Sequence, residues 1–547
     1  MFRNNQIQSF LENLGPQKEQ NYSLWKASSI DKVPTNSFSP LRKDDGSWAQ
    51  SDSEKGTILA SHLSNVFKPN PKQIDFEPVF YTPETVSHPP KVTFEELKET
   101  IDNINIKKAP GYDKISGKMI KNLPFDAIWF LLTIFNHIFA IGHYPKPWKV
   151  SLIKMIPKPG KDPTVASSYR PISLLSLLSK VFEKIVISKI QPFLDDHHCI
   201  PDHQFGFRKK HGTIEQVHRI AQEIHNAFND NKYCAAVFLD VAQAFDKVWH
   251  EGLLHKIKLY LPENTHKLLR SYIKYRKFRL SYNTFVSREF DIQAGVPQGS
   301  VLGPLLYLIY TADLPQNPNT LTSTFADDTA IISCHYEHNV ASKILSTHLR
   351  ELEGWLRKWR VKVNESKSTH ITFTLKRKTC PAIYLNGTTI PQKDVVKYLG
   401  IHLDRRLTWK PHIDAKITQA RLKTLQLNWL INQNSNLSLT NKVLLYNTVI
   451  KPIWMYGMEL WSSACASSIE RFQRLQNKIL RMICGAPWYM KTIHIHKDLN
   501  VPMVSEVILS VIPRYKSKLR QHPNPNARNL LVQGLNCRLK RNKLLPS

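Results

Sequence analysis

Two apolar runs along the chain carry acidic residues at their ends. Residues 235–239 are followed by Asp240, and Asp327 and Asp328 stand together within a second apolar run. Such runs predict buried strands, with the adjacent acids at a hairpin. Neighbouring carboxylates in apolar surroundings repel each other and lose solvation, which favours protonation unless a cation compensates them. An isolated Asp-Asp pair is more often a solvated turn, but three acids in this setting indicate a site for divalent metal.

Caps, turn signals and hydrophobic periodicity predict further elements. A capping box of Thr93 and Glu96 opens a helix that runs toward Ile106. Asn386-Gly387 between two short apolar segments predicts a two-residue hairpin turn, and the pattern becomes helical after about Arg405. This order of strands and helices predicts an α+β fold with the acids on neighbouring strands. The other expected elements are a helix over 53–67, a buried helix over 127–141, a strand over 151–156, a long helix beyond Gly295, and a strand-like alternation at His494 and His496.

Composition and charge narrow the class of protein and of partner. At 547 residues and 63.3 kDa, with 42% apolar residues, the chain is long enough for several globular domains. A net charge of +31 and a pI near 9.7 indicate a polyanionic partner, and nucleic acid fits better than a membrane because residues 127–141 are too few to span one. Seven cysteines without a Cys-x-x-Cys pair argue against a disulfide framework or a zinc knuckle. We therefore expect an intracellular protein of the cytoplasm, the nucleus or both.

Three motifs that surround the acids resemble the palm motifs of a reverse transcriptase. They are residues 238–246 (FLDVAQAFD), 294–304 (AGVPQGSVLGP) and 325–328 (FADD). They occur in the order of that family and at fitting separations. The resemblance implies a right-hand polymerase fold of fingers, palm and thumb, with a helical C-terminal region.

Three upstream segments make the resemblance more specific. Residues 156–160, 168–173 and 204–208 are similar to the fingers motifs of non-LTR retrotransposon polymerases, among which the jockey-like clade fits best. The resemblance runs from about Phe94 to Trp488, which is most of the chain.

The resemblance implies catalytic roles for the acids and their neighbours. Asp240 and Asp327 would be metal ligands, with Asp328 beside them and the main-chain carbonyl of Val241 completing a site for two Mg²⁺ ions. Phe245 falls where the family places an aromatic ring under the incoming sugar, and its bulk would exclude a 2′-hydroxyl. A core phenylalanine is the alternative for this position.

Nucleotide contacts follow from the same resemblance. Lys158 and Arg170 match basic fingers residues that hold the triphosphate. Gln298 and Gly299 match the nucleotide-facing turn, where glycine lets the backbone approach the base pair. Lys367 matches a lysine near the leaving pyrophosphate, which a positioned ammonium could protonate. Either lysine could instead be a solvated loop residue.

Nucleic-acid contacts are expected at three further places. Tyr398, Leu399 and Gly400 resemble a primer grip, and Arg208 would bind template or form a structural salt bridge. Apolar residues recur at helical spacing over 469–483, while cations occupy another face, as in a thumb that grips duplex. A solvated basic face is the alternative. The cations are Arg471, Arg474, Lys478 and Arg481.

The chain divides into five expected regions. After Glu506 the sequence has no acidic residue and many cations, which fits either a tail that binds nucleic acid without sequence choice or a disordered end. The expected regions are a polar connector over 1–90, an N-terminal fingers extension over 91–137, fingers and palm over 138–404, a helical thumb over 405–500 and a basic tail over 501–547.

The resemblance implies an RNA-directed DNA polymerase of a mobile element. It would add deoxynucleotides to a primer 3′-hydroxyl by two-metal catalysis, with an RNA template, a DNA primer, the RNA–DNA hybrid and deoxynucleoside triphosphates as partners. The oligomeric state stays open. A viral RNA-dependent RNA polymerase is a rival against which Phe245 and residues 297–299 argue, and an inactive or domesticated remnant that only binds RNA or DNA is another. Because the resemblance begins near Phe94, we expect the element's N-terminal endonuclease to be missing.

Overall fold

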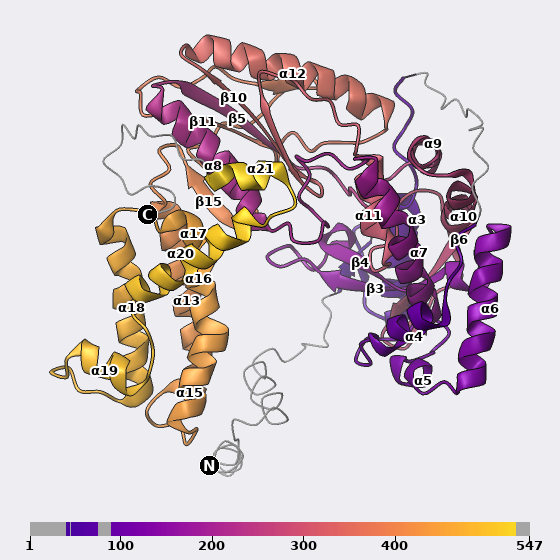
Figure 1. Ribbon diagram of the computed structural model, residues 1–547, viewed down its shortest axis with the longest axis horizontal. Coiled ribbons are helices and arrows are strands. Elements are labelled where there is room, and N and C mark those ends of the chain that lie inside the picture. The colour runs from indigo at the N-terminus through magenta and orange to yellow at the C-terminus, as the bar shows by residue number, and fades with distance from the viewer. Residues whose placement is uncertain (1–39, 44, 75–88, 532–547) are drawn as a thin grey trace.

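Three groups of elements make up the part of the chain that the structure describes, residues 40–43, 45–74 and 89–531. This computed structural model combines sheets and helices and is an α+β fold, as the order of the predicted elements indicated. Figure 1 shows a sheet with helices on it at the top, N-terminal strands and helices at the lower right, and C-terminal helices at the lower left.

The upper group is built on a four-stranded antiparallel sheet. In spatial order its strands are β11 (Thr369–Phe373), β5 (Tyr233–Leu239), β10 (Asp328–His335) and β9 (Leu321–Phe325). All seven residues of β5 are buried. Helices α12 (His338–Lys358) and α8 (Thr213–Asn229) both pack on this sheet (Figure 1).

Alternate side chains of β5 enter two different hydrophobic cores. Ala235 and Val237 belong to the core that includes α12, whereas Ala236 and Phe238 belong to the core that includes α8 and the C-terminal helices. A strand that is buried on both faces needs apolar residues at every position, which explains the unbroken apolar run. Asp240 is the first residue beyond this strand, so two cores fix its place.

A second sheet lies beside the first and carries the N-terminal part of the fold. It consists of β4 (Tyr169–Leu174), β3 (Val150–Pro157), β6 (Arg276–Tyr282), β7 (Phe285–Val286) and β8 (Phe290–Ile292). Strand β3 runs antiparallel to β4 and parallel to β6, so the predicted strand over 151–156 is confirmed. The predicted helix over 53–67 is α3 (Asp52–Val66), which packs on β6. A small hairpin, β1 (Leu41–Arg42) with β2 (Trp48–Ala49), precedes α3.

The N-terminal helices α4 (Phe94–Asp102), α5 (Gly117–Lys121) and α6 (Phe125–Ile141) form the lower right part of Figure 1. The predicted capping box is confirmed, because Thr93 and Glu96 cap α4 reciprocally, although the helix ends before Ile106. The predicted helix over 127–141 is present as α6, but only one of its faces is buried. Helix α6 packs one face against α4 and α10 (Glu263–Ile273), while the side chain of Phe130 on its other face is 70% exposed.

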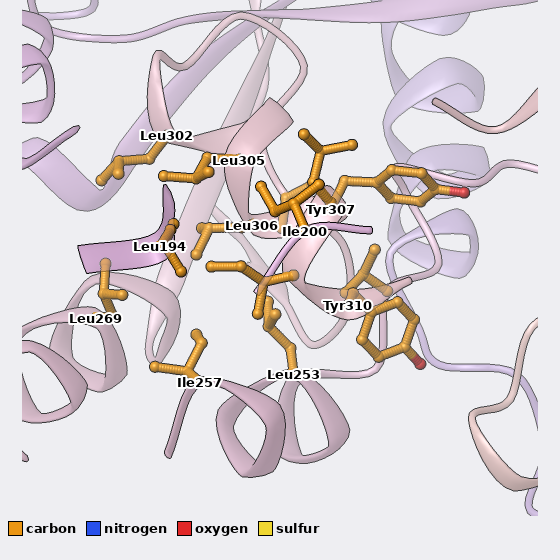
Figure 2. Packing of buried hydrophobic residues seen from close by; sticks show 14 of the residues in the cluster. Leu194, Ile200, Leu253, Ile257, Leu269, Leu302, Leu305, Leu306, Tyr307 and Tyr310 are labelled. Atoms are coloured by element: carbon orange, nitrogen blue, oxygen red, sulfur yellow. The ribbon is translucent and has the colours of Figure 1, made fainter. Parts of the chain in front are cut away.

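Helix α11 (Leu302–Tyr310) is shorter than the long helix expected beyond Gly295. It begins only at Leu302 because residues 295–301 form a loop that contacts other segments. Figure 2 shows its side chains packed among those of α7 (Leu177–Asp196), α9 (His250–Tyr260) and α10. The packing fixes the end of the preceding loop. The labelled neighbours are Leu194, Ile200, Leu253, Ile257 and Leu269.

Two hairpins connect the upper sheet to the C-terminal helices. The first, β12 (Tyr384–Leu385) with β13 (Thr388–Thr389), turns at Asn386 and Gly387, which both have positive φ, so the predicted hairpin is confirmed. The second is β14 (Val395–Tyr398) with β15 (Ile401–Asp404).

The chain is helical beyond Asp404, as predicted. The helices are α13 (Lys410–Gln426), α14 (Asn428–Ile431), α15 (Leu439–Leu445), α16 (Lys451–Met455), α17 (Met458–Trp461), α18 (Ala466–Cys484), α19 (Thr492–Asp498), α20 (Val504–Arg520) and α21 (Pro525–Arg528). The strand-like alternation at His494 and His496 is a wrong prediction, since both residues lie in α19. Among the described residues, no helix combines the length and apolarity needed to cross a bilayer.

The expected C-terminal tail is folded over its first part. Helices α20 and α21 pack back onto α8, where Lys518 forms an ion pair with the buried Glu215 and Tyr515 contacts His218. The disordered end considered for this region is therefore excluded for residues 504–531. Residues 532–547, like residues 1–39 and 75–88 of the expected connector, lie outside the described part.

Candidate active site

The sheet brings the three acids together. Asp240 directly follows β5, and Asp327 lies in the two-residue turn between β9 and β10. Asp328 opens β10, whose next residue pairs with the last residue of β5. The antiparallel register therefore places all three carboxylates at one edge of the sheet, although 87 positions separate Asp240 from Asp327.

Residues of the 204–208 segment hold the turn that carries Asp327. The buried side chain of Gln204 accepts a hydrogen bond from the main-chain N–H of Ala326 at 2.9 Å and donates one to its carbonyl at 3.3 Å. A Cβ on Gly206 would lie 2.1 Å from the Ala326 nitrogen, so only glycine allows this approach. Ala326 itself has a φ of 58°, a conformation that these contacts stabilise.

Burial and mutual repulsion disfavour the charged forms of Asp327 and Asp328. Burial raises the pKa of Asp327 above its ordinary value, and repulsion from Asp240 adds to the effect. Loss of solvation, followed by repulsion from Asp327 and Asp240, raises the pKa of Asp328 to about 6. Carboxylate oxygens are the ligands that hard divalent cations prefer, so this donor set fits such an ion. Within the described residues, no group of three or more His, Cys, Asp or Glu side chains is already arranged to hold a metal.

A loop after α12 fixes the main chain around Asp240. The N–H of Asn364 donates to the Asp240 carbonyl at 2.8 Å, and the Asp240 N–H donates to the hydroxyl of Ser368 at 3.2 Å. Val241 pairs with Val363, and this pair is flanked by two main-chain hydrogen bonds. They run from the N–H of Asn364 to the Asp240 carbonyl and from the N–H of Ala242 to the Lys362 carbonyl. In an antiparallel pair of this type, the carbonyl of Val241 points away from Val363. Its direction is compatible with the ligand role that the resemblance implies.

Three cations gather near the acids. Lys367 extends from the same loop, with its ammonium 3.9 Å from the Asp240 carboxylate. Arg170 on β4 is exposed and acts on Asp327, where it favours the charged carboxylate. Lys158 has a lowered pKa because of burial and because Arg170 and Lys367 lie nearby. Its ammonium also donates to the carbonyl of Ser167 at 2.8 Å, so it is held within its own turn.

Phe245 lies between two aromatic rings near the acids. Its ring stacks on Tyr307 with centroids 4.7 Å apart and forms a T-shaped contact with the ring of Phe207, with centroids 5.6 Å apart. Tyr307 belongs to the buried α11, and burial together with Asp327 raises its pKa. Phe245 is therefore half-buried against the core and close to the acids.

The loop over 295–301 joins the second sheet to the segment that follows β5. The main-chain carbonyl of Gln298 accepts from the N–H of Ser173 on β4 at 2.8 Å. Gly299 has a φ of 122°, and a Cβ there would lie 2.5 Å from the Ser173 carbonyl oxygen. The side-chain amide of Gln298 donates to the buried carboxyl of Asp246 at 2.8 Å. Gln298 and Gly299 are thus fixed by backbone contacts and by one buried acid.

A second buried acid anchors the other end of this loop. The carboxylate of Glu183, on α7, accepts from the N–H groups of Val301 at 2.7 Å and Leu302 at 3.1 Å. Its other oxygen accepts from the hydroxyl of Ser179 at 2.8 Å. A carboxylate is stabilised at the N-terminus of a helix, which here is α11. Glu183 therefore fixes where the loop ends and α11 begins.

The hairpin of β14 and β15 reaches the back of the acidic turn. Tyr398 is buried, and its hydroxyl donates to the carbonyls of Ser323 and Asp328 at 3.4 Å each. Leu399 and Gly400 form the hairpin turn with positive φ. The hydroxyl of Tyr456 donates to the Leu399 carbonyl at 2.6 Å and so fixes this turn to the C-terminal helices.

Two of the expected nucleic-acid contacts are engaged inside the protein. Arg208 donates to the carbonyls of Pro201 at 3.1 Å and Gln204 at 3.2 Å, and it lies 3.9 Å from Asp202. The structure therefore favours the structural alternative for Arg208. On α18, Arg481 donates to the carbonyls of two residues in the following loop.

The predicted cation row on α18 is only partly present. The apolar face is buried as predicted, but Arg471 forms an ion pair with Asp414 on α13. Arg474 and Lys478 are exposed, with Arg474 3.7 Å from Glu470. With Arg481 bound to its own loop, the row reduces to these two exposed cations.

Several residues that support the site have no role in the prediction from the sequence. They are Gln204, Gly206, Glu183, Asp246, Asn364 and Ser368. A polar residue inside an apolar segment, such as Asp246 after Phe245 or Glu183 within a helical run, is the available sequence signal, because buried polar groups need partners. The partners themselves become known only from the fold.

Comparisons with known proteins agree with this geometry. The family described as "Reverse transcriptase (RNA-dependent DNA polymerase)" matches residues 156–403. The chain is 39% identical over 539 residues to the probable RNA-directed DNA polymerase from transposon X-element of Drosophila melanogaster, with 96% of this chain and 59% of that protein covered. It is 38% identical over 540 residues to the RNA-directed DNA polymerase from mobile element jockey of the same species, with the same coverage of 96% and 59%.

A third relative extends the agreement. It is the probable RNA-directed DNA polymerase from transposon BS of Drosophila melanogaster, 39% identical over 558 residues, with 98% of this chain and 61% of that protein covered. The chain thus spans about three fifths of the length of these curated relatives. Residues 156–403 therefore match the reverse transcriptase family, and the chain is similar over most of its length to polymerases of mobile elements such as jockey.

Proposed function

We propose that this protein is an RNA-directed DNA polymerase of a mobile element. One observation carries the proposal: the sheet places Asp240 beside Asp327 and Asp328, with Lys158, Arg170 and Lys367 gathered near them. Carboxylates suited to divalent cations and side chains suited to a polyphosphate are the two halves of a nucleotidyl-transfer site. The match of residues 156–403 to the reverse transcriptase family supports the choice of reaction.

The acids would hold two Mg²⁺ ions. Asp240, Asp327 and the carbonyl of Val241 are the proposed ligands, with Asp328 beside them. When bound, the ions supply activation of the primer 3′-hydroxyl and charge compensation at the leaving group. The protein's own contribution is positional, because the β5–β10 register and the Asn364 and Ser368 contacts hold the donor atoms.

The surrounding residues would bind and select the nucleotide. Arg170 and Lys158 would hold the triphosphate, and Lys367 would lie near the leaving pyrophosphate, where its ammonium can stabilise or protonate it. The stack of Phe245 on Tyr307 supports a fixed ring below the sugar that leaves no room for a 2′-hydroxyl. Residues around Gln298 would contact the new base pair.

We propose that these regions form the right-hand arrangement of a polymerase, with fingers, palm and thumb. Residues 91–137 would extend the fingers, residues 138–404 would form fingers and palm, and residues 405–500 would form a thumb. The hairpin turn at Leu399 and Gly400, tied to both Asp328 and the C-terminal helices through Tyr398 and Tyr456, supports a role in placing the primer end. The RNA–DNA hybrid would lie against the thumb, with Arg474 and Lys478 toward its phosphates.

Primer extension tests the proposal. The assay uses oligo(dT) annealed to poly(rA), Mg²⁺ and dTTP, with UTP replacing dTTP in a second arm. Extension with dTTP that depends on Mg²⁺ and disappears in Asp240→Asn supports the proposal. Preference for UTP would identify an RNA polymerase. Binding of the hybrid without any extension would identify a remnant that only binds nucleic acid, and either result would refute the proposal.

A further inference from the structure

The loop after α18 exposes two large aromatic side chains side by side. Trp488 is 89% exposed and Tyr489 is 72% exposed. Their rings are 5.9 Å apart at an interplanar angle of 81°, so each presents an open face. Exposed aromatic surface of this size forfeits the hydrophobic stabilisation that burial would give, and contiguous exposed apolar surface often marks a binding site.

The loop is a fixed support for these rings. Its four residues form a turn in which the N–H of Met490 donates to the carbonyl of Pro487 at 3.2 Å, with Trp488 and Tyr489 at the two central positions. The guanidinium of Arg481 donates to the same Pro487 carbonyl at 2.8 Å and to the Met490 carbonyl at 2.5 Å. One side chain therefore clamps both ends of the turn.

The entry to this turn is fixed as well. Helix α18 ends at Gly485 in the left-handed conformation, with a φ of 65°, and a Cβ there would meet the side chain of Gln433 at 2.8 Å. The two rings consequently project from a rigid helix end. A preorganised aromatic pair loses little conformational entropy when a ligand stacks on it.

The electrostatic surroundings select the ligand. From Arg471 to Lys497 the sequence contains no acidic residue. Neither does the segment over 428–445, which includes α14 and α15 and supplies Gln433. The exposed cations in this acid-free region are Arg474, Lys478, Lys491 and Lys497. The region is bordered by two carboxylates, Glu470, which lies 3.7 Å from Arg474, and Asp498, which follows Lys497, so cations outnumber acids around the rings. Aromatic rings in such basic surroundings complement a polyanion that carries flat rings.

We infer that Trp488 and Tyr489 form a stacking site for unpaired nucleobases of single-stranded nucleic acid. Stacking needs an accessible base face, which a single strand offers along its length and a duplex offers only at its ends. The cations attract the backbone without sequence choice. Figure 1 places α19 at the far end of the C-terminal helices from the sheet that carries the acids, so the site is separate from the catalytic region.

This site would hold the unpaired part of a template or target strand while synthesis takes place elsewhere on the protein. The inference rests on the proposed function for this biological role. The binding of a single strand does not depend on polymerisation, so the two can be tested separately.

Fluorescence anisotropy with labelled 12-nucleotide single strands tests the inference on the full chain. We expect Trp488→Ala with Tyr489→Ala to weaken binding of oligo(dT) and oligo(U) by at least about fivefold, the lower end of what one stacked base contributes. Trp488→Phe keeps a ring and should restore most of the affinity. Phe130→Ala, which removes an equally exposed aromatic on α6, is the matched control and should bind like the wild type.

Varying the salt concentration and the ligand in this assay distinguishes base stacking from other modes of binding. The loss in the double alanine variant should persist when KCl is raised from 50 to 300 mM, because stacking is not screened, whereas the loss in Lys478→Ala should shrink. Comparing oligo(dT) with oligo(U) identifies the preferred strand. Unchanged single-strand affinity in the double variant would overturn the inference, as would a loss confined to anionic lipid vesicles.

Primer extension by the same variants separates this inference from the proposed function. A wild type that extends primers while all variants bind single strands equally would refute the stacking site alone. A wild type that never extends, yet binds single strands through these rings, would refute the polymerase and leave the stacking site standing.

Discussion

The side-chain amide of Gln298 donates a hydrogen bond of 2.8 Å to the carboxyl of Asp246, which is only 5% exposed. Asp246 lies six residues after Asp240, and Gln298 lies in the loop that contacts β4. The bond therefore links the segment that follows Asp240, the first of the three clustered acids, to the loop proposed to face the new base pair. Asp246 acts as a positioning residue for Gln298.

Removing the Asp246 carboxyl, which accepts the hydrogen bond from Gln298, should affect nucleotide binding more than the rate of the chemical step. We expect Asp246→Ala to raise KM for the deoxynucleotide about tenfold with a smaller change in kcat, because the Gln298 amide loses one oriented hydrogen bond worth about 1 kcal/mol or more. Asp246→Asn keeps an acceptor oxygen and should restore KM. Steady-state kinetics of primer extension measure both constants. Equal losses of kcat in both variants would show a general structural effect instead.

The same residue predicts a pH dependence of stability. Burial raises the pKa of Asp246 to about 7, against the opposing influence of the Gln298 hydrogen bond and of Lys158 and Lys247. Between its unfolded value near 3.8 and about 7, the folded state binds the proton more tightly than the unfolded state does. The wild type should therefore lose stability as pH rises through this window, by up to roughly 4 kcal/mol for three pKa steps.

Asp246→Asn removes this dependence because an amide does not titrate. The melting temperature of the variant, relative to the wild type, should rise between pH 4 and pH 7 and stay level above pH 7. Thermal unfolding followed by circular dichroism at several pH values provides the measurement. Parallel pH profiles for the two proteins would show that Asp246 does not titrate in this range.

Neutralising either of two acids should abolish synthesis and spare binding. Asp240→Asn and Asp327→Asn remove donors for the metal ions, so we expect primer extension to fall by about a hundredfold or more, the scale seen when one electrostatic contact to the transition state is lost. Hybrid affinity rests on dispersed cations and should change little. Asp291→Asn, an exposed acid on β8, is the control. Near wild-type extension by either active-site variant would refute the metal-site assignment.

Phe245 should control the choice of sugar. Phe245→Val opens space above the Tyr307 ring, so we expect the preference for dTTP over UTP, measured as a ratio of kcat/KM, to fall at least about tenfold. Tyr307→Phe keeps the stacked ring below Phe245 and should keep the preference. If the valine variant discriminates like the wild type, Phe245 belongs to the core alone.

The cations of the C-terminal helices should differ in their effect on salt dependence. Lys478→Gln removes an exposed charge and should lower the slope of log affinity for hybrid against log salt by about 0.9 or somewhat less, whereas Arg474→Gln should lower it less because Glu470 lies 3.7 Å from that arginine. Arg471→Gln should leave the slope nearly unchanged, because that arginine is paired with Asp414. Fluorescence anisotropy across a KCl series gives the slopes. A loss of slope in Arg471→Gln equal to that in Lys478→Gln would contradict the pairing.

Much of the local structure could be predicted because its causes are local. The apolar run of β5, the capping box at Thr93 and the turn at Asn386-Gly387 each depend on residues within a few positions of one another. The predictions were wrong where one local sequence pattern is compatible with two different structures. Alternation at His494 and His496 occurs in a helix, and the apolar stretch of α6 is buried on one face only. Tertiary packing decides such cases.

The order of the motifs, the acids at the ends of apolar strands and the basic character of the chain follow from residue type and spacing alone. Which polar side chains meet depends on the folded arrangement of distant segments. Asp246 finds Gln298 52 positions away, and Lys518 finds Glu215 303 positions away. Arg481, predicted to face phosphate, instead holds the turn of Trp488 and Tyr489. The sequence shows which side chains can donate or accept hydrogen bonds but not their partners. The partners depend on the fold, because a buried or half-buried polar group needs a hydrogen bond where it lies.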